Sequence, residues 1–170
     1  MNLFEERNVN VFNTPLEVGL RLLYVLNALK PSTCDLQRLI FYDYILLHSS
    51  DIPEGPKSIH PNVPFRSTEI LVKRELVKKG LTLMHSKQLV KVLFDSKGIL
   101  YVASDITGAF LNYINSEYAN KLKLVAHWLV NKFESYSDKD LSQYIKNNMD
   151  VWGGEFSKES LLRGTQNESY

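Results

Sequence analysis

The stretch LHSSDIPEGPKSIHPNVPFRSTE, residues 47–69, gathers side chains that could bind a metal or move a proton. His48 and His60 lie here together with Asp51 and Glu69, and imidazole and carboxylate groups serve both kinds of chemistry. The two other histidines are far away along the sequence, and none of the four falls into an HxH, HxxxH or HExxH spacing. Because such spacings place two ligands side by side on one element, we interpret the stretch as a polar connector and expect no metal or other cofactor.

Cys34 is the single cysteine of the chain and the best candidate for a nucleophile. It stands at the start of a predicted helix, where the helix dipole could lower its pKa, although a small buried cysteine is the simpler interpretation. The sequence contains no GxSxG, GxxxxGKS/T or GxGxxG pattern, and those patterns position a nucleophile or a phosphate in many enzymes. We therefore predict a chain without enzymatic activity.

The cellular compartment is indicated by what the sequence lacks. A lone cysteine excludes an internal disulfide and is typical of a reducing cytosol. The N-terminal residues do not contain the apolar stretch of a secretory signal, and the most apolar run, residues 39–47, is about half of a membrane span. We predict a cytoplasmic protein that does not contact the membrane.

Basic residues are concentrated between residues 66 and 97, where eight lysines and arginines accompany three acidic residues. Residues 133–170 show the reverse, with seven acidic and four basic residues, whereas the whole chain has a formal net charge of only +1. Such an asymmetry indicates either a surface that faces a protein or nucleic-acid partner or two ordinary solvated faces. Along residues 67–86 basic and apolar positions alternate, which favours a helix packed on more than one side with lysine stems reaching solvent.

Helix signals place the first two predicted elements. A helix begins at Asn13 or Thr14, has Pro15 in its first turn and ends before Pro31, in keeping with the preferences for capping residues and proline. The second helix begins at residue 33 or 35 and runs to about residue 47. It is apolar almost all round, so we expect it at the centre of the core.

Residues 49–66, the connector, follow the second helix. Four prolines and Gly55 exclude a continuous helix and a central strand here, and we predict a stiff, extended segment that docks against another subunit. Ser67 or Thr68 then caps a third helix. This helix continues through Gly80 to about residue 86, because apolar positions recur beyond the glycine.

A change of period marks a β-hairpin after the third helix. Two short runs rich in valine, leucine and aromatic residues, 89–94 and 99–103, flank the turn DSKG. Ser104 or Asp105 is predicted to cap a following helix, Ser116 opens a longer one, and a last helix begins near Ser137.

This order predicts a mainly α fold with a winged helix-turn-helix-like core, made of three helices plus a β-hairpin wing, and a C-terminal helical extension. The expected divisions are a winged-helix-like domain over residues 1–115, the extension over 116–162 and a flexible tail over 163–170. Trp152 and Phe156 are large apolar residues of the extension. They predict either a helical lid on the first domain or an exposed anchor for another subunit.

Several blocks of the sequence resemble one protein family. They are NTPLEVGLRLLYVLNAL, DLQRLIFYDYILLHSSD, SIHPNVPFRSTEILVKRELVKKGL, LFDSKGILYVAS and VWGGEFSKESLL. The family is the middle component, type two, of ABC-three-component systems, the bacterial defence operons that include Lamassu. The resemblance covers about residues 11–162.

The resemblance implies a non-catalytic adaptor subunit in an anti-phage or anti-plasmid defence complex. Such proteins are encoded between an effector, often a nuclease, and an SMC/Rad50-like ATPase, and they are thought to join the two so that sensing of foreign DNA by the ATPase releases the effector. ATP and the nuclease metal would belong to these partners, and DNA could be contacted within the complex. The family provides no catalytic residue to assign to this chain.

A winged-helix DNA-binding transcription regulator is the alternative, since the basic third helix and the wing could approach DNA. For the adaptor, we expect one interface at the third helix and residues 52–66, and another at the Trp152–Phe156 segment. Charge reversal at Lys78 and Lys79, or Trp152→Ala, is expected to weaken assembly without unfolding the protein. The residues assigned to a partner or DNA interface are His60, Arg66, Lys73, Arg74, Lys78, Lys79, Lys97, Trp152 and Phe156.

Overall fold

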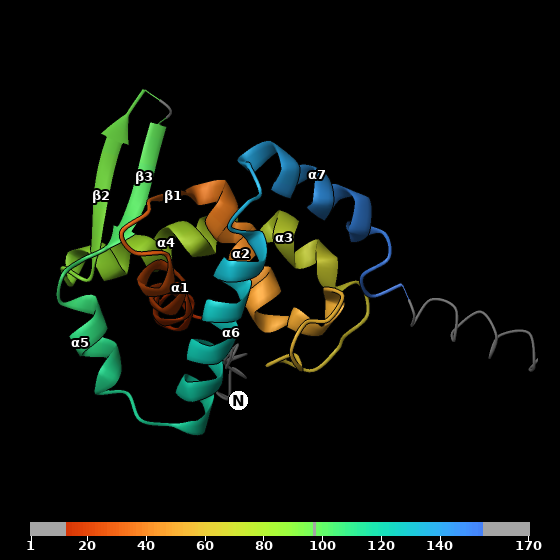
Figure 1. Cartoon of the computed structure of the whole chain (residues 1–170), viewed down its shortest axis with the longest axis horizontal. Coiled ribbons are helices and arrows are strands. Elements are labelled where there is room, and N and C mark those ends of the chain that lie inside the picture. Colours follow the sequence, from red (N-terminus) through yellow and green to blue (C-terminus); the bar gives the residue numbers. More distant parts are fainter. Residues whose placement is uncertain (1–12, 97, 155–170) are drawn as a thin grey trace, which may run out of the picture.

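The computed structural model describes residues 13–96 and 98–154, and α-helices account for most of this part of the chain (Figure 1). A small antiparallel sheet adjoins them, so the prediction of a mainly α fold is confirmed. No helix of the described residues is long and apolar enough to cross a bilayer. The elements are α1 (Pro15–Leu29), β1 (Cys34–Asp35), α2 (Leu36–Leu47), α3 (Glu69–Val72), α4 (Arg74–Ser86), β2 (Val90–Asp95), β3 (Gly98–Ala103), α5 (Thr107–Asn112), α6 (Glu117–Phe133) and α7 (Asp138–Met149), with short 3-10 helices at Ser49–Asp51 and Arg66–Thr68.

Side-chain caps begin four of the helices, as predicted. Thr14 accepts a hydrogen bond from a backbone amide in the first turn of α1 (3.2 Å), and Asp35 does the same for α2 (2.7 Å). Ser116 caps α6 and Ser137 caps α7 in the same way. A cap of this kind contributes about 1 kcal/mol, so these helix starts follow from local sequence.

Two other predicted caps are wrong. No side chain caps α3, because the Thr68 hydroxyl donates instead to the backbone carbonyl of Phe65 (2.8 Å). No side chain caps α5 either, which begins at Thr107. The Ser104 hydroxyl hydrogen-bonds to the Thr107 hydroxyl (3.1 Å), and Asp105 pairs with two lysines. Other partners therefore occupy the predicted capping groups: a local one for Ser104, and distant lysines for Asp105.

The predicted hairpin is confirmed and belongs to a three-stranded sheet. β2 and β3 pair antiparallel from Val90 opposite Ala103 to Asp95 opposite Gly98. The hairpin projects beyond the helices (Figure 1). β1, only two residues long, pairs with β3 and gives the strand order β1-β3-β2. The sequence did not reveal β1, because two residues are too few to show alternation.

One hydrophobic core joins the helices. Leu22 of α1, Ile45 of α2, Leu81 of α4, Leu129 of α6 and Ile145 of α7 are all buried members of it. The apolar α2 lies buried along most of its length, as expected. Residues on both sides of position 116 therefore contribute to the same core.

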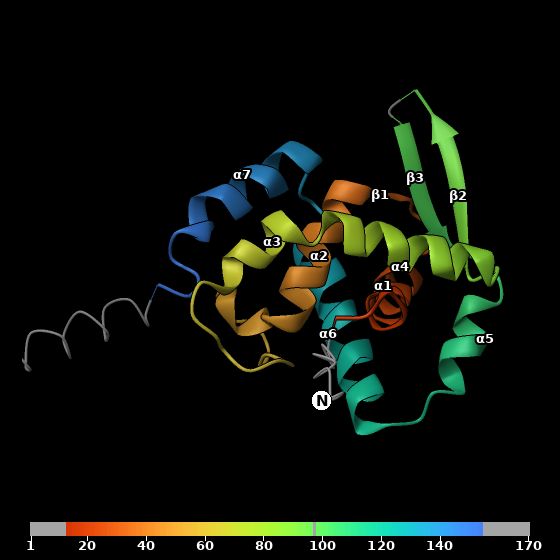
Figure 2. The same cartoon turned by 180° about the vertical axis from the view of Figure 1, so that it is seen from behind.

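Two glycines let α1 and α4 approach closely (Figure 2). A Cβ atom on Gly80 would lie 2.9 Å from the backbone nitrogen of Gly19 and 3.0 Å from the backbone oxygen of Pro15. A Cβ atom on Gly19 would in turn meet Met84 at 2.7 Å. The predicted continuation of the helix through Gly80 is confirmed, and close helix packing is the reason for the glycine.

The predicted third helix is nevertheless interrupted. It consists of α3 and α4, with Lys73 between them. Lys73 is buried, and its side chain reaches carboxylates inside the molecule. The prediction of one continuous helix over residues 67–86 is wrong, and the break directs Lys73 into the network described next.

Candidate functional site

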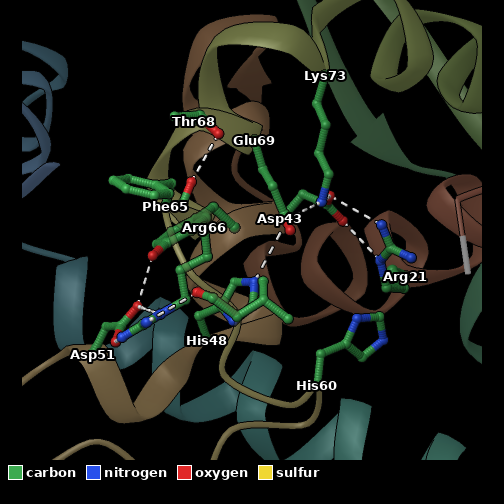
Figure 3. A network of polar contacts seen from close by, with 12 residues as sticks. Arg21, Asp43, His48, Asp51, His60, Phe65, Arg66, Thr68, Glu69 and Lys73 are labelled. Carbon is green, nitrogen blue, oxygen red and sulfur yellow. Dashed lines mark hydrogen bonds and ion pairs between the residues drawn. The ribbon is translucent and has the colours of Figure 1, made fainter. Parts of the chain in front are cut away.

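A group of charged side chains lies buried where α1, α2 and the α3–α4 break meet (Figure 3). The side chains of Arg21 and Asp43 are both 0% exposed, and Nε and Nη2 of Arg21 donate to the two Asp43 oxygens at 2.9 and 3.0 Å. Such a two-point pair combines charge with fixed geometry. It ties α1 to α2 inside the helical body.

Lys73 extends this group from the break between α3 and α4. Its Nζ donates to a Glu69 oxygen at 2.7 Å and lies 3.6 Å from Asp43. His48 ends α2, as expected, and its buried Nε2 lies 3.6 Å from Glu69, which is too long for a hydrogen bond. We call Arg21, Asp43, His48, Glu69 and Lys73 the charge network; in it, Arg21 and Lys73 balance the two carboxylates.

The charge network determines the ionisation of its carboxylates. Burial alone would raise the pKa of Asp43, but Arg21 and Lys73 outweigh burial and hold this pKa below its ordinary value. Burial also opposes ionisation of Glu69, yet His48 and Lys73 lower its pKa to about 2. Both groups are therefore charged at neutral pH. Because both are occupied by cations of the same chain, the arrangement holds helices together.

A second buried ion pair closes the connector. Arg66 donates through Nε to Asp51 at 2.8 Å and through Nη2 to the other Asp51 oxygen. The Tyr44 hydroxyl of α2 donates to the same carboxylate at 2.6 Å. Asp51 and Arg66 lie at the two ends of the connector, so this pair fixes both ends against α2.

The connector is not the extended segment that its prolines predicted. The backbone amides of Ile59 and His60 both donate to the carbonyl of Leu47, at 3.0 and 3.1 Å, and Ile52 is buried in the core. Proline fixes its own φ angle but does not keep a chain straight, and here the turns between the prolines return the chain to the end of α2.

His60 packs beside α6 and does not join His48 in a metal site. Its Nε2 lies 3.3 Å from the Tyr118 hydroxyl. Burial and the nearby positive charge of Arg21 lower the pKa of His60 to about 4, so the imidazole is neutral at neutral pH. Within residues 13–96 and 98–154, no three His, Cys, Asp or Glu side chains come together in a way that could hold a metal ion.

Cys34 is a buried cysteine of β1. Burial, followed by the negative charge of Asp35, raises the pKa of its thiol well above the ordinary value. A thiolate is therefore disfavoured. The simpler of the two interpretations of Cys34, a small buried side chain, is confirmed.

The residues after α7 close over the connector. Trp152 is 5% exposed and stacks on Tyr44 with ring centroids 5.2 Å apart. Gly153 has a φ of +87°, and a Cβ atom there would lie 2.6 Å from the backbone nitrogen of Phe65. The prediction of Trp152 as an exposed anchor is wrong, because Tyr44 and Tyr144 cover its indole ring. The alternative, a lid on the preceding helices, describes what the structure shows.

Large apolar side chains are exposed around α3. Phe65, Leu71 and Val72 are 61%, 69% and 76% exposed. Phe65 has a φ of 53°, a left-handed conformation that bulky residues rarely adopt, and Arg66 and Gly153 hold the backbone beside it. A groove of about 420 Å³ follows between α2, α3 and α7, with Leu71 and Arg74 on its wall. We call Phe65, Leu71, Val72 and Arg74 the α3 surface.

Comparison with known protein families identifies the chain. A family model described as ABC-three component (ABC-3C) system Middle Component 2 matches residues 11–155. The chain belongs to this family. The matched range contains the charge network, the connector and the Trp152–Gly153 lid. Neither the curated proteins nor the solved structures contain a match to the chain.

Membership of the Middle Component 2 family confirms the resemblance drawn from the sequence blocks. A middle component of an ABC-three-component system has a role in a defence system and works with other components. Such contacts with other components are made by exposed side chains.

Several predicted interface residues of this middle component lie inside it. Arg66 and Lys73 are buried and occupied by carboxylates of the chain, and Trp152 is part of the core. His60 is half-buried against Tyr118. These residues were predicted to be exposed because they are basic or aromatic. Whether such a side chain turns inward depends on carboxylates and rings that lie far away along the chain, and the residue type alone does not show this.

Arg74, Lys78 and Lys79 do lie exposed on α4. Lys78 pairs with Glu75 at 3.3 Å. Lys97 and Phe156 lie outside the residues that the structure describes.

Leu71 and Val72 were not predicted as interface residues, because apolar positions between residues 67 and 86 were expected to pack inside the molecule. Only Ile70 of α3 is buried, because α3 is a single turn that ends at the Lys73 break. One face of a single helical turn cannot bury three adjacent apolar residues such as Ile70 to Val72. This run was the sequence pattern from which exposed apolar side chains could have been predicted.

Proposed function

We propose that this chain is a non-catalytic adaptor in an anti-phage or anti-plasmid complex. It links an SMC/Rad50-like ATPase to an effector, which we expect to be a nuclease. Membership of the middle-component family supports a place among partner subunits. ATP and the nuclease metal belong to these partners, DNA is contacted within the assembly, and the complex works in the cytoplasm. The observation that carries the proposal is the α3 surface.

The α3 surface has the composition of a protein-binding patch. Phe65, Leu71 and Val72 are each exposed within residues 65–72, the chain segment that enters α4, and exposed large apolar groups on a short segment are typical of interaction sites. Arg74 adds a charged group at the groove beside Leu71, and arginine is enriched at interfaces. The patch therefore offers apolar anchors with a basic edge.

The buried ion pairs order the backbone beneath the α3 surface before a partner binds. The Asp51–Arg66 pair fixes the backbone next to Phe65, and Glu69 of α3 is tied to Lys73. Gly153 lies against the same backbone from the other side. Binding groups that are already ordered lose less conformational entropy on association. The connector therefore serves as a support for the α3 surface.

Co-expression with the neighbouring ATPase and effector genes tests the adaptor function. The wild-type chain is expected to elute with both partners in size exclusion with light scattering, and Leu71→Asp with Val72→Asp is expected to release one of them. Leu124→Asp is the matched control, since Leu124 is 72% exposed on α6. If the wild-type chain forms no stable complex, the adaptor function is rejected.

Charge reversal on α4 tests whether its exposed lysines contribute to the interface. Lys78→Glu with Lys79→Glu is expected to weaken assembly or protection while the fold stays intact, because both side chains are exposed. Unchanged assembly and protection would remove these lysines from the interface.

We also propose that α1, β1, α2, the α3–α4 segment and the β2–β3 hairpin form a winged helix. The order of these elements and the strand order β1-β3-β2 support this arrangement. In it, the hairpin is the wing and α4 is the recognition helix. The hairpin carries the exposed Phe94 directly opposite the exposed Ile99, a pair that suits a protein surface better than a phosphate backbone.

A DNA-binding transcription regulator is the second candidate function. The exposed Arg74, Lys78 and Lys79 on α4 favour it, because lysine and arginine neutralise phosphates. The isolated protein would then bind its own promoter in a sequence-specific way, with an affinity that falls steeply as salt increases. Absent or salt-insensitive binding in an electrophoretic mobility assay rejects this candidate.

A further inference from the structure

An apolar groove lies at the other end of α4 from the α3 surface. Figure 2 shows α5 below the C-terminal end of α4, and the groove is formed there by side chains of α1, α4 and α5 and of the segments that flank β2 and β3. Its volume is about 550 Å³, and nine of the ten residues that line it are apolar or aromatic. Met84 and Leu89 form a buried floor.

The rim of this groove exposes large side chains. Tyr113 is 89% exposed, Leu16 56%, Ile106 53% and Phe110 37%. These residues come from the start of α1, the entry to α5, α5 itself and the residue after it, so folding brings them together from distant parts of the chain. A concave apolar surface with an exposed apolar rim is typical of a site that another protein covers.

The elements that line the groove favour a helix as its occupant. Three helices line it, so a fourth helix placed there would pack against all of them with the ridges-into-grooves contacts that helices make. Amphipathic helices commonly bind in this way, through apolar anchors at positions i, i+3 or i+4, and i+7.

The charge of the groove indicates which residues the bound helix carries beside its apolar face. Lys87 is the charged residue among those that line the groove, and none of the ten is acidic. Lys87 is exposed. A carboxylate on the partner helix would face it, whereas a lysine or arginine at that position would be repelled.

We propose that the α5 groove, defined by Leu83, Lys87, Ile106, Phe110 and Tyr113, binds an amphipathic helix of a partner subunit that carries acidic residues beside its apolar face. The inference rests on the proposed adaptor function and adds a second docking site to it. α4 has 13 residues, so it separates the two sites by about 20 Å at 1.5 Å per residue. One partner then binds at each end of α4.

Site-specific cross-linking in the complete three-component complex identifies the occupant. A photo-crosslinking amino acid at position 113 is expected to attach to a partner segment with apolar residues at helical spacing and an adjacent Asp or Glu. A cross-link to a second copy of this chain, or to its own residues 1–12, overturns the inference. So does the lack of any cross-link to a partner when the assembled complex is irradiated.

Substitutions measure the contribution of the groove. Phe110→Asp and Tyr113→Asp are each expected to weaken binding of one partner about 30-fold or more, the size of an interface hot spot, and Lys87→Glu by a smaller factor. The other partner stays bound. Tyr113 is so exposed that its replacement leaves the fold intact, which circular dichroism checks, and Leu124→Asp on α6 serves as the control.

The outcomes separate this inference from the adaptor function. Binding of both partners within about 2-fold of wild type by the Phe110→Asp and Tyr113→Asp variants overturns the groove alone. Equal losses in the Leu124→Asp control overturn it as well, because the effect is then not specific to the groove. A wild-type chain that binds neither partner overturns both proposals.

Discussion

The two ends of α4 are constructed in different ways. At its N-terminal end, buried charges hold the connector and α3: the charge network on one side and the Asp51–Arg66 pair on the other. At its C-terminal end, apolar side chains surround the α5 groove, and just before that groove α1 packs on the middle of α4 through Gly19 and Gly80. The first region depends on matched charges, the second on shape.

This difference predicts how each region responds to substitution. A buried ion pair adds little net stability, but removing one partner leaves the other charge without compensation. Apolar packing responds in proportion to the volume that is removed or added. The N-terminal end should therefore be sensitive to single losses of charge, and the C-terminal end to single changes of size.

Asp43→Ala is expected to give the largest effect. It leaves Arg21 buried without its carboxylate, which costs about 3–5 kcal/mol of unfolding free energy, measured by urea denaturation. Glu75→Ala is the control, because Glu75 and Lys78 form an exposed pair whose loss costs at most about 1 kcal/mol. Equal costs at the two sites would contradict the assigned role of the charge network.

Trp152→Ala is expected to destabilise the fold by about 3 kcal/mol, since it removes a buried indole that stacks on Tyr44. Thermal unfolding measures the change, and Val151→Ala, next to it but exposed, should stay within about 0.5 kcal/mol. A folded, fully stable Trp152→Ala variant that loses only a partner would restore the view of Trp152 as an anchor.

Gly80→Ala examines the packing that depends on shape, where α1 crosses the middle of α4. Alanine favours a helix over glycine by about 1 kcal/mol, yet its Cβ would lie 2.9 Å from the Gly19 backbone, and overpacking costs about 1–3 kcal/mol. We expect a net loss of stability in urea denaturation. Gly108→Ala is the control, because its Cβ meets only the Asn27 side chain, at 3.3 Å. A stabilised Gly80→Ala variant would show that α1 and α4 can separate without cost.

The smallest expected effect is a pH dependence at the N-terminal end. Burial and neighbouring cations lower the pKa of His60 from 6.5 to about 4, and the pKa of Glu69 falls from 4.5 to about 2. The unfolded chain therefore binds protons more readily than the folded chain, and stability decreases as pH falls. The decrease begins below pH 6.5 through His60 and continues below pH 4.5 through Glu69.

Thermal midpoints recorded between pH 7.5 and pH 4 examine this dependence. His60→Gln should flatten the curve between about pH 6.5 and pH 4, because it removes the group that titrates there. His85→Gln is the control, because His85 lies at the other end of α4, where its Nδ1 is 2.8 Å from the Val90 carbonyl oxygen. An identical slope in the His60→Gln variant would contradict the burial of His60 beside the charge network.

Local sequence predicted much of the fold. Thr14, Ser116 and Ser137 marked helix starts correctly, because a capping hydrogen bond joins residues three apart. The turn DSKG between two β-rich runs predicted the hairpin for the same local reason. The caps at Thr68 and Asp105 were wrong, because a partner outside the helix competed for each side chain.

The candidate site was predicted less well than the fold. Arg74, Lys78 and Lys79 lie exposed where the basic segment placed them, but Arg66, Lys73 and Trp152 turn inward. The exposed Leu71 and Val72 and the whole α5 groove were not predicted. Periodicity shows that a segment has apolar positions, and it does not show how many of them other helices will cover.

The mainly α fold, most helix starts, the hairpin and the resemblance to the middle-component family could be predicted from the sequence, because each depends on residue types at short separations or in recognisable blocks. Three other features became visible only in the folded molecule: the histidine-containing connector folds back on α2, Lys73 interrupts a helix, and Trp152 is buried. Each of these depends on a partner far along the chain: Asp51 for Arg66, Asp43 for Lys73 and Tyr44 for Trp152. Whether a charge or a ring is buried is decided by such partners, because burial is favourable only where they are already in place.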